Sequence, residues 1–369
     1  MKKIKVTHLT SAHPRYDARV FMKECSSLAK IEEYHVSLVV ADGLGDEIKN
    51  GVEIFDVGKL EGRLNRIVKT TKRVFEKAKE LDSDIYHIHD PELISVALRL
   101  KKRDKKVIFD IHEDVPKQIM AKPYLNGVSK RVLSFLYGLY EGIQCKKFDY
   151  IITPTPYINQ RFKKLNKASV EVRNYPIIDE LVNDTVWSSR KEGVCHIGSL
   201  AQTRGVLEII QSLAFSHTRL ALGGDFRPKE LKNRAKALSG WKYVDYLGYL
   251  SRDEVKSVLS KTKIGLVTLH PTDSYLEAIP VKMFEYMAAG IPVIASDFPL
   301  YREMLQGCDC ALFVDPLDPK GIADATMRLL KDDEMAHRMG ENGKKSVLER
   351  FNWSSEEKKL YDVYKELTR

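Results

Sequence analysis

The stretch EAIPVKMFEYMAAGIPVIAS at residues 277–296 predicts a helix that runs directly into a buried strand. Pro280 suits the first turn of a helix, and Gly290 suits the position just after its end. Ile291 to Ala295 then form an apolar run, as in a parallel strand covered by helices on both faces. This succession indicates an α/β fold of the doubly wound kind.

The rest of the chain repeats this alternation of short apolar runs and longer amphipathic segments. Strands are expected at 4–9, 35–40, 85–89, 107–111, 150–153, 194–197, 219–222, 243–247, 264–269, 291–295 and 311–314. Helices are expected at 15–30, 63–80, 92–102, 128–146, 205–215, 280–289, 319–331, 334–349 and 354–368. We therefore predict two Rossmann-like domains, each with a doubly wound parallel sheet, at residues 1–175 and 176–353. The last helix, 354–369, is expected to pack back on the first domain.

Composition excludes several classes of protein. Of the 369 residues, 43% are hydrophobic and 30% are charged, which is ordinary for a globular chain and unlike a disordered one. No apolar run reaches the roughly 18 residues of a membrane span, and Lys5 and His8 interrupt any N-terminal apolar segment. Five scattered cysteines without a Cys-x-x-Cys pair favour free thiols in a reducing compartment, so we expect a cytoplasmic protein.

The net charge of +9 is concentrated in the first half of the chain. Residues 1–176 hold 33 basic and 23 acidic residues, whereas residues 177–369 hold 27 and 28. A basic half favours an anionic partner such as a membrane surface, a phosphorylated lipid or a nucleic acid. A solvated basic face without a specific partner explains the same numbers.

Polar side chains follow three strands expected in the first half. Residues beyond the carboxyl ends of parallel strands are candidates for chemistry, because ligands of open sheets bind there. His13 and Arg15 follow the first strand, Asp90 the third and His112 the fourth. From its position alone, His112 serves equally well as a loop histidine.

These strand ends also contain ligand types that a metal accepts, at His89, Asp90, His112 and Glu113. No spacing signature of a metal site supports that interpretation, so no metal is expected. His87 alternates with His89 on one strand face, and its position in the middle of the strand favours a core histidine.

A candidate anion site lies in the second half, where a strand, a loop with glycines and a helix follow one another. The loop begins at Gly198 and Ser199 and ends at Arg204 and Gly205. Backbone N–H groups and the helix dipole favour a phosphate there, and Arg204 adds a charged donor. The spacing differs from the glycine motifs of dinucleotide-binding proteins and of P-loop ATPases.

Two glutamates belong to the opening stretch, one inside its helix and one ahead of it. Glu285 stands among apolar residues, where a carboxylate is costly unless it is paired or binds something. Pairing with Lys282, three residues earlier, is the structural alternative. Glu277 lies just ahead of the helix, where it can face a ligand whose phosphates rest on the helix N-terminus.

These motifs resemble the retaining glycosyltransferases of family 4, which have the GT-B fold with two Rossmann-like domains facing a central cleft. The resemblance rests on Glu277 and Glu285, which are spaced as E-x7-E, on GSLAQTRG at 198–205 and on FDIHED at 109–114. HIHDPEL, LALGGDF, YLGYLSRDEV and FNW support it. It covers nearly the whole chain and implies a hexosyltransferase that uses a UDP- or GDP-linked sugar.

The resemblance implies roles for individual residues. Glu277, Arg204 and His112 would act on the reacting sugar and diphosphate, and His13, Arg15 and Asp90 would lie on the acceptor side. The donor would be bound by Glu285, Lys282, Gly198, Ser199, Gly205, Gly248 and Tyr249. Two departures stand out: the family often has a basic residue where this chain has Ser199, and the glycine-rich loop after the first strand is replaced by His13-Pro14-Arg15.

The implied reaction is transfer of a sugar to a saccharide hydroxyl with retention of anomeric configuration, without cofactor or metal. A lipid-linked acceptor in surface polysaccharide biosynthesis fits the basic first half. A nucleotide-sugar epimerase or hydrolase of the same fold is an alternative. A non-catalytic nucleic-acid-binding protein is another, although the basic runs lack interleaved aromatic residues.

The segment from Lys130 to Lys147 bears on the membrane question. It carries apolar residues between flanking basic ones, as does an amphipathic helix at an anionic membrane. The basic run KKRDKK at 101–106 adds to this, and together they favour a peripheral site on the inner face of the membrane. The alternative is that the apolar residues form a buried helix face.

Overall fold

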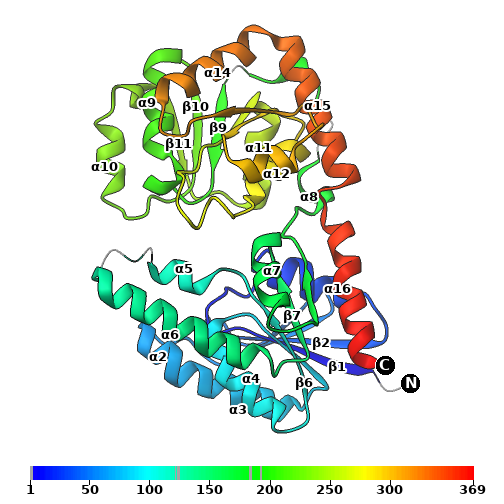
Figure 1. The fold of residues 1–369 in the computed structure, drawn as a ribbon. Coiled ribbons are helices and arrows are strands. Elements are labelled where there is room, and N and C mark those ends of the chain that lie inside the picture. The colour runs from blue at the N-terminus through cyan, green and yellow to red at the C-terminus, as the bar shows by residue number, and fades with distance from the viewer. Residues whose placement is uncertain (1–2, 121, 123–124, 183–184, 192) are drawn as a thin grey trace. The chain divides into compact units, whose positions relative to one another are not determined.

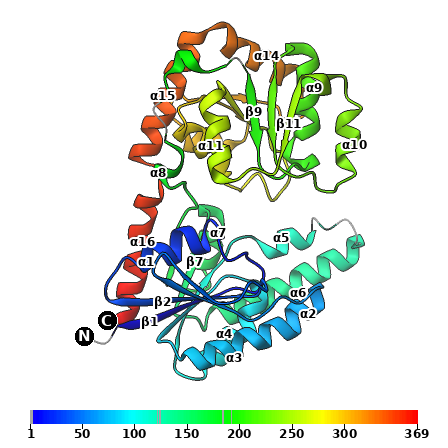
Figure 2. The same cartoon turned by 180° about the vertical axis from the view of Figure 1, so that it is seen from behind.

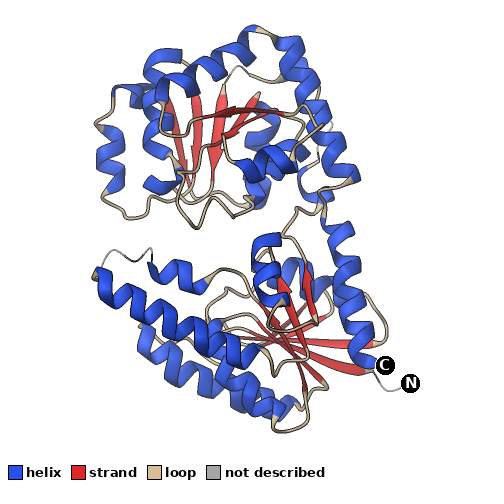
Figure 3. Ribbon diagram, in the orientation of Figure 1, coloured by secondary structure: helices blue, strands red, loops and turns tan. Residues whose placement is uncertain are grey.

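The computed structural model describes residues 3–120, 122, 125–182, 185–191 and 193–369. The chain divides into two compact units, one made of residues 1–174 and 354–369 and the other of residues 175–353. Both are α/β units in which helices cover a largely parallel sheet (Figure 3). The predicted fold class is confirmed.

The first unit holds an eight-stranded sheet in the order β3-β4-β2-β1-β5-β6-β7-β8. Its strands are β1 (Ile4–Leu9), β2 (Tyr34–Val40), β3 (Glu47–Lys49), β4 (Val52–Asp56), β5 (Ile85–Ile88), β6 (Lys106–Asp110), β7 (Tyr150–Thr153) and β8 (Ser169–Glu171). Neighbouring strands are parallel except for β3 and β4.

Three short strands of this sheet were not predicted, namely β3, β4 and β8. A tight turn at Asn50 and Gly51 joins β3 to β4, and both turn residues have positive φ, at 51° and 75°. An Asn-Gly pair is the usual signal of such a hairpin. The turn signal is therefore present in the sequence, but the two strands beside it contain polar residues and so lack the apolar run by which a strand is predicted.

The helices of the first unit lie on both faces of its sheet (Figures 1 and 2). One face packs against α3 (Thr71–Leu81) and α4 (Ile94–Lys101) through the apolar core. The other face meets the π-helical turn η1 (Val20–Cys25), α1 (Ser26–Leu28) and the last helix α16 (Trp353–Thr368). The predicted helix at 15–30 therefore begins only at Val20.

The remaining helical segments of this unit are mostly short. They are α2 (Arg63–Asn65), η2 (Arg66–Thr70), η3 (Pro91–Leu93), α5 (Val115–Met120), α6 (Gly127–Cys145) and α7 (Pro156–Lys163). The helix expected at 63–80 is thus divided among α2, η2 and α3, and that at 92–102 between η3 and α4.

The second unit holds a six-stranded sheet of parallel strands in the order β11-β10-β9-β12-β13-β14. The strands are β9 (Val194–Ile197), β10 (Leu220–Gly223), β11 (Val244–Gly248), β12 (Ile264–Val267), β13 (Val293–Ser296) and β14 (Ala311–Val314). All six were predicted, with boundaries that differ by at most two residues.

Four longer helices of this unit agree with the sequence analysis: α9 (Val206–Ser216), α12 (Val281–Ala288), α14 (Pro319–Lys331) and α15 (Asp333–Glu349). The segments α8 (Ile178–Leu181), η4 (Trp187–Ser189), η5 (Gln202–Arg204), α10 (Leu231–Lys236), η6 (Ser239–Tyr243), α11 (Arg252–Lys261) and α13 (Pro299–Met304) were not among the expected helices. Pro280 caps α12, and Gly290 follows its end with a φ of 71°.

Each sheet has one point where the strand order reverses, at β1/β5 and at β9/β12. At this point the connections that follow the two neighbouring strands run to opposite faces of the sheet. A crevice therefore forms beyond the carboxyl ends of these strands. The predicted site residues of each unit follow these strands or their neighbours, except Gly248 and Tyr249, which lie at the end of the edge strand β11.

Candidate active site

The loop after β9 has a backbone that requires glycine. Gly198 has a φ of 129°, and its N–H donates to the carbonyl oxygen of Gly223 at 2.9 Å. Gly205 caps α9 with a φ of 74°, and a Cβ there would lie 2.0 Å from the carbonyl oxygen of Thr268. These glycines place the start of α9 against the end of β12, which leaves backbone N–H groups for an anion.

Lys282 is a buried cation beside this loop. Its side chain comes from α12, and its Nζ would lie 3.2 Å from a Cβ added to Gly198. No described residue provides a hydrogen-bond partner for Nζ. Burial, reinforced by the charge of Arg204, lowers the pKa of Lys282 to about 7. A buried ammonium without a partner is costly, so the pocket around it is suited to an anion.

Arg204 supplies a second cation at the same place. It ends the 3₁₀ turn η5, directly before Gly205, and is half-buried. Its guanidinium carbon lies 6.0 Å from the centre of the Tyr275 ring. Together with Lys282 it surrounds the loop with two positive charges, which compensates for the absence of a basic residue at Ser199.

Glu285 has a partner that the sequence analysis did not identify. Its Oε1 accepts a hydrogen bond from Nη1 of Arg252 at 2.8 Å, and Nη2 of Arg252 donates to Glu180 at 2.8 Å. The expected alternative, a pair with Lys282, is absent among the described residues. The Glu285 side chain is 18% exposed, so a ligand can reach it.

The remaining donor-side residues lie on loops of the second unit. Glu277 is half-buried ahead of α12 and has no hydrogen bond or ion pair within the described part of the chain. Gly248 ends β11 with a φ of 70°, and its carbonyl oxygen accepts from the N–H of Gly224 at 2.6 Å. Tyr249 is 79% exposed. The structure brings Gly198, Gly205 and Lys282 into one site, and it leaves the ring of Tyr249 in solvent.

The first unit has its own hollow at the ends of β1, β5 and β6. His13, Arg19, Asp90 and His112 line its polar part, and α6 contributes Leu133, Tyr137 and Tyr140. Three of the four predicted residues of this unit therefore lie in one pocket. Arg15 does not line it, because its guanidinium is bonded to Asp42 and Glu47 at 2.7–2.8 Å.

Asp90 holds the loop that carries His13. Its Oδ2 accepts from Oγ1 of Thr10 at 2.8 Å and from the N–H of Ser11 at 2.6 Å. His13 lies between Asp17, at 3.2 Å, and Asp90, at 3.5 Å. Burial lowers the pKa of His13, but the Asp17 hydrogen bond and the neighbouring carboxylates raise it by more, so the net shift is upward.

His112 is oriented by a buried carboxylate. Its Nε2 lies 2.9 Å from Oδ2 of Asp110, and its side chain is 18% exposed. Both arms of the Arg19 guanidinium bind Asp110, at 2.8 and 2.7 Å. Burial acts to raise the pKa of Asp110, but the charges of Arg19 and His112 hold it well below its usual value. Asp110 therefore accepts the Nε2 proton of His112, and in the neutral form of the ring Nδ1 is the acceptor.

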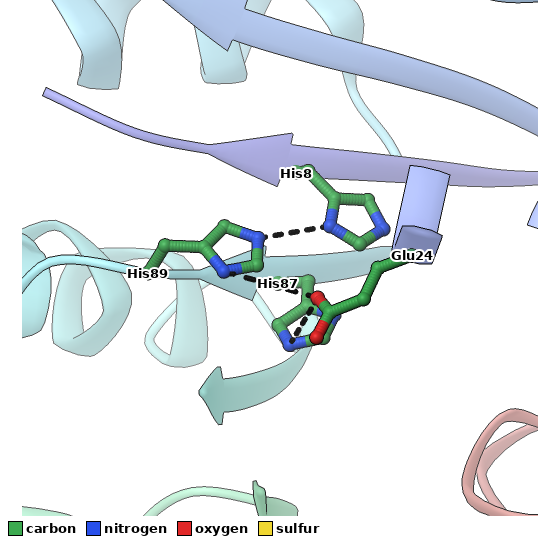
Figure 4. A group of neighbouring side chains, drawn as sticks. All are labelled: His8, Glu24, His87 and His89. Carbon is green, nitrogen blue, oxygen red and sulfur yellow. Dashed lines mark hydrogen bonds and ion pairs between the residues drawn. The ribbon is translucent and has the colours of Figure 1, made fainter. Parts of the chain in front are cut away.

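Two groups of side chains in this unit have the ligand types of a metal site. The first is His8, Glu24, His87 and His89 (Figure 4). Its His8 Nδ1 and His89 Nε2 are only 2.9 Å apart, and the two rings are stacked with an interplanar angle of 12°. Because these nitrogens point at each other, their lone pairs do not converge on an ion.

The second group is His89, Asp110 and His112. Here Asp110 already binds the permanent charge of Arg19 in a bidentate pair, so a cation would lie against another cation. Both groups fit a hydrogen-bonded network better than a metal. Asp90 and Glu113, which the sequence offered as ligand types, belong to neither group.

Two family models match the chain. The model for glycosyl transferases group 1 matches residues 178–346, and the model for glycosyltransferase family 4 matches residues 18–173. The chain belongs to the family 4 glycosyltransferases with the GT-B fold, and it is a glycosyltransferase.

Individual relatives are distant in sequence. N-acetyl-alpha-D-glucosaminyl L-malate synthase of Bacillus anthracis is 23% identical over 85% of this chain and 89% of its own. Sucrose-phosphate synthase of Thermosynechococcus elongatus has a similar fold, with a TM-score of 0.81, 16% identity and 99% of each chain covered. Anabaena HepE, solved with UDP-glucose, has a TM-score of 0.74 and 13% identity over 98% of this chain and 100% of its own. None of the helices described is long and apolar enough to cross a bilayer.

Proposed function

We propose that this glycosyltransferase takes a sugar from a UDP- or GDP-linked donor and transfers it, with retention, to a hydroxyl of a saccharide acceptor. One observation carries the proposal: Lys282 places a buried ammonium, which no described residue bonds, against the Gly198 loop. A diphosphate is the anion that a glycosyl donor presents at such a loop. The fold shared with Anabaena HepE, solved with UDP-glucose, supports this choice of donor.

The charge that develops on the leaving group determines the mechanism. The bond between the anomeric carbon and a phosphate oxygen breaks, and that oxygen gains negative charge. Arg204, Lys282 and the N–H groups at the start of α9 are fixed donors that stabilise it. The acceptor oxygen bonds the anomeric carbon on the face that the diphosphate leaves, and the acceptor proton passes to the phosphate oxygen.

The two glutamates bind the parts of the donor on either side of the diphosphate. Glu285 uses the oxygen that Arg252 does not engage to accept a ribose hydroxyl, and Glu277 accepts hydroxyls of the sugar. His112 presents Nδ1 to a sugar hydroxyl from the first unit. Because cations of the chain already balance the leaving charge, we propose that transfer needs no metal, and EDTA is expected to leave the rate unchanged.

The acceptor is proposed to be carried on a lipid, because α6 exposes an apolar face. Its exposed members are Val128, Val132, Leu133, Phe135, Leu136, Leu139, Tyr140 and Ile143, with exposed fractions between 40% and 74%. These residues form what we call the α6 apolar face. They are not a buried helix face, as the alternative reading of this segment required. Lysines and Arg131 flank them, which suits an anionic bilayer.

The donor assignment is tested by titrating the protein with UDP-glucose and GDP-mannose in a calorimeter. Wild-type protein is expected to bind one of them, and Lys282→Gln to bind it at least tenfold more weakly, as for a lost contact between a cation and a phosphate. Lys261→Gln, a change at an exposed lysine of α11, is the matched control. Equal affinity of wild type and Lys282→Gln would refute the assignment.

Product analysis separates transfer from the alternatives. A transferase consumes its donor rapidly only when a saccharide acceptor is present, and it releases the nucleoside diphosphate in equal amount to the new glycoside. Rapid donor turnover without an acceptor would favour an epimerase or a hydrolase instead.

A further inference from the structure

The buried face of the first sheet carries three histidines that the proposed reaction does not use. His8 lies on β1, His87 lies on β5, and His89 directly follows β5 (Figure 4). All three are at most 1% exposed. The hydroxyl of Tyr364, a fully buried residue of α16, reaches two of them. Polar rings at such depth need hydrogen-bond partners, and Nε2 of His87 is the one nitrogen of these three rings that has none among the described residues.

The distances link these groups into one chain. Tyr364 Oη lies 2.9 Å from Nδ1 of His87 and 3.2 Å from Nε2 of His8. His8 Nδ1 lies 2.9 Å from Nε2 of His89. His89 Nδ1 in turn lies 3.4 Å from Oδ2 of Asp110 and 3.3 Å from Nε2 of His112. Asp110 is the carboxylate that also holds Nε2 of His112.

Asp110 determines which atom donates and which accepts in every hydrogen bond of this series. It is ionised beside Arg19, so it only accepts. Nδ1 of His89 therefore carries a proton, and its Nε2 accepts from Nδ1–H of His8. His8 Nε2 then accepts the hydroxyl proton of Tyr364.

Tyr364 completes the chain by accepting Nδ1–H of His87. Burial is the main cause that lowers the pKa of each histidine, of His89 to about 4 and of His8 and His87 well below the usual value. All three rings are thus neutral near pH 7, and each has its proton on Nδ1.

We propose that Tyr364 is a positioning residue for His112, acting through His8, His89 and Asp110. The inference rests on the role of His112 in the proposed function. Without the tyrosine hydroxyl, His8 Nε2 loses its donor, and the opposite tautomers become available. His89 would then direct the lone pair of Nδ1 at the Asp110 carboxylate and displace the group that orients His112.

The proposal links the last helix of the chain to the pocket of the first unit. Helix α16 carries Tyr364, while its neighbour Tyr361 donates to the carbonyl oxygen of Ser27 outside the chain of histidines. Tyr361→Phe is therefore a matched control that removes one hydroxyl from the same helix.

The first test is an NMR spectrum of wild-type protein labelled with ¹⁵N at histidine. Long-range ¹H–¹⁵N correlations distinguish the two neutral tautomers and the charged ring. We expect Nδ1–H tautomers for His8, His87 and His89, and in Tyr364→Phe altered signals for His8, His89 and His112. A proton on Nε2 of His8 in the wild type would overturn the proposal, as would a stoichiometric metal bound to these rings. Unaltered His112 signals in Tyr364→Phe would overturn it too.

The second test is a double-mutant cycle on the transfer rate. Tyr364→Phe is expected to lower kcat about fivefold, as for one lost hydrogen bond, with KM for the donor little changed. The same change in a His112→Ala background is expected to have no further effect, whereas a merely structural role would lower both rates equally. Tyr361→Phe should leave kcat unaltered. If His112→Ala itself retains full activity, the role of His112 in the proposed function is wrong. The NMR spectra then still test whether the hydrogen bonds run from Tyr364 through the histidines to Asp110.

Discussion

The two candidate sites differ in how their charges are balanced. In the second unit, the ammonium of Lys282 is buried and has no hydrogen-bond partner among the residues that the structure describes. In the first unit, the carboxylate of Asp110 is equally buried, but Arg19 and His112 bind it fully. The difference indicates that the second unit lacks an anion that its ligand must bring. In the first unit the buried charge of Asp110 is already paired, so its ligand does not have to supply a compensating charge there.

The strongest test of this comparison removes the charge of Arg204. Arg204→Ala is expected to lower kcat about 10²–10³-fold, because a fixed donor to the developing charge is lost. Steady-state transfer assays with saturating donor measure the effect. Arg328→Ala, which removes an exposed arginine of α14, should leave the rate unchanged. Near-normal turnover of Arg204→Ala would mean that the anion does not lie at this loop.

A substitution that alters the backbone, but no charge, also tests whether the loop from Gly198 to Gly205 binds the anion. In Gly205→Ala the new Cβ would lie 2.0 Å from a backbone oxygen at a φ of 74°. The loop must shift, so we expect unfolding free energy to fall by about 3 kcal/mol and donor affinity to fall with it. Urea unfolding and calorimetry measure the two quantities.

Gly248→Ala is its matched control. Gly248 has a similar φ of 70°, but no atom lies within 4 Å of an added Cβ. Only the backbone strain remains, with an expected loss of about 1 kcal/mol. Equal destabilisation by the two substitutions would show that the contact of Gly205 with Thr268 is unimportant.

The sequence predicted the sites better than it predicted their partners. The loop from Gly198 to Gly205 and the helix after Pro280 follow from local signals, namely glycine, proline and apolar runs. The pair of Glu285 with Arg252 joins residues 33 positions apart, which no local pattern reveals. A basic residue at the start of the helix after β11 is the one trace of it in the sequence.

The first unit shows the same limit. Strand-end polarity identified His13, Asp90 and His112, which line one pocket. Arg15 was chosen by the same rule, yet it pairs with the loop after β2, because a local rule does not give the direction of a long side chain. The partner of Asp110 is Arg19, from a segment whose π-helical start the periodicity did not reveal.

The pH dependence of donor binding tests the unpartnered charge directly. The pKa of Lys282 is lowered to about 7 by burial, so the ammonium that binds a diphosphate is lost as pH rises above 7. Affinity for a nucleotide sugar, whose diphosphate diester keeps its charge, is expected to fall up to about tenfold per pH unit between 7 and 9. Lys282→Met should bind weakly with little dependence on pH.

The free protein should respond to pH in the opposite direction. Between pH 7 and about 10 the unfolded chain binds a proton at Lys282 that the folded protein lacks. Stability of the unliganded protein relative to Lys282→Met is therefore expected to rise with pH over this range. Thermal unfolding of both proteins measures it, and a constant difference between them would show that Lys282 is ordinarily solvated.

The smallest expected effect concerns the α6 apolar face, which belongs to the first unit and not to the unit that is proposed to bind the donor. Phe135 and Leu136 are 67% and 56% exposed and belong to a continuous run of exposed apolar residues along α6. Phe135→Ser with Leu136→Ser should weaken sedimentation with phosphatidylglycerol vesicles about tenfold, the effect of withdrawing two apolar side chains from a bilayer. Transfer to a soluble saccharide acceptor should be unaffected, because the donor loop lies in the other unit.

Leu317→Ser, at a position of the second unit that is 52% exposed, controls for a general loss of surface hydrophobicity. Equal sedimentation of the wild type and the double variant would contradict a membrane-bound acceptor, because it would leave this exposed face without a role at the bilayer.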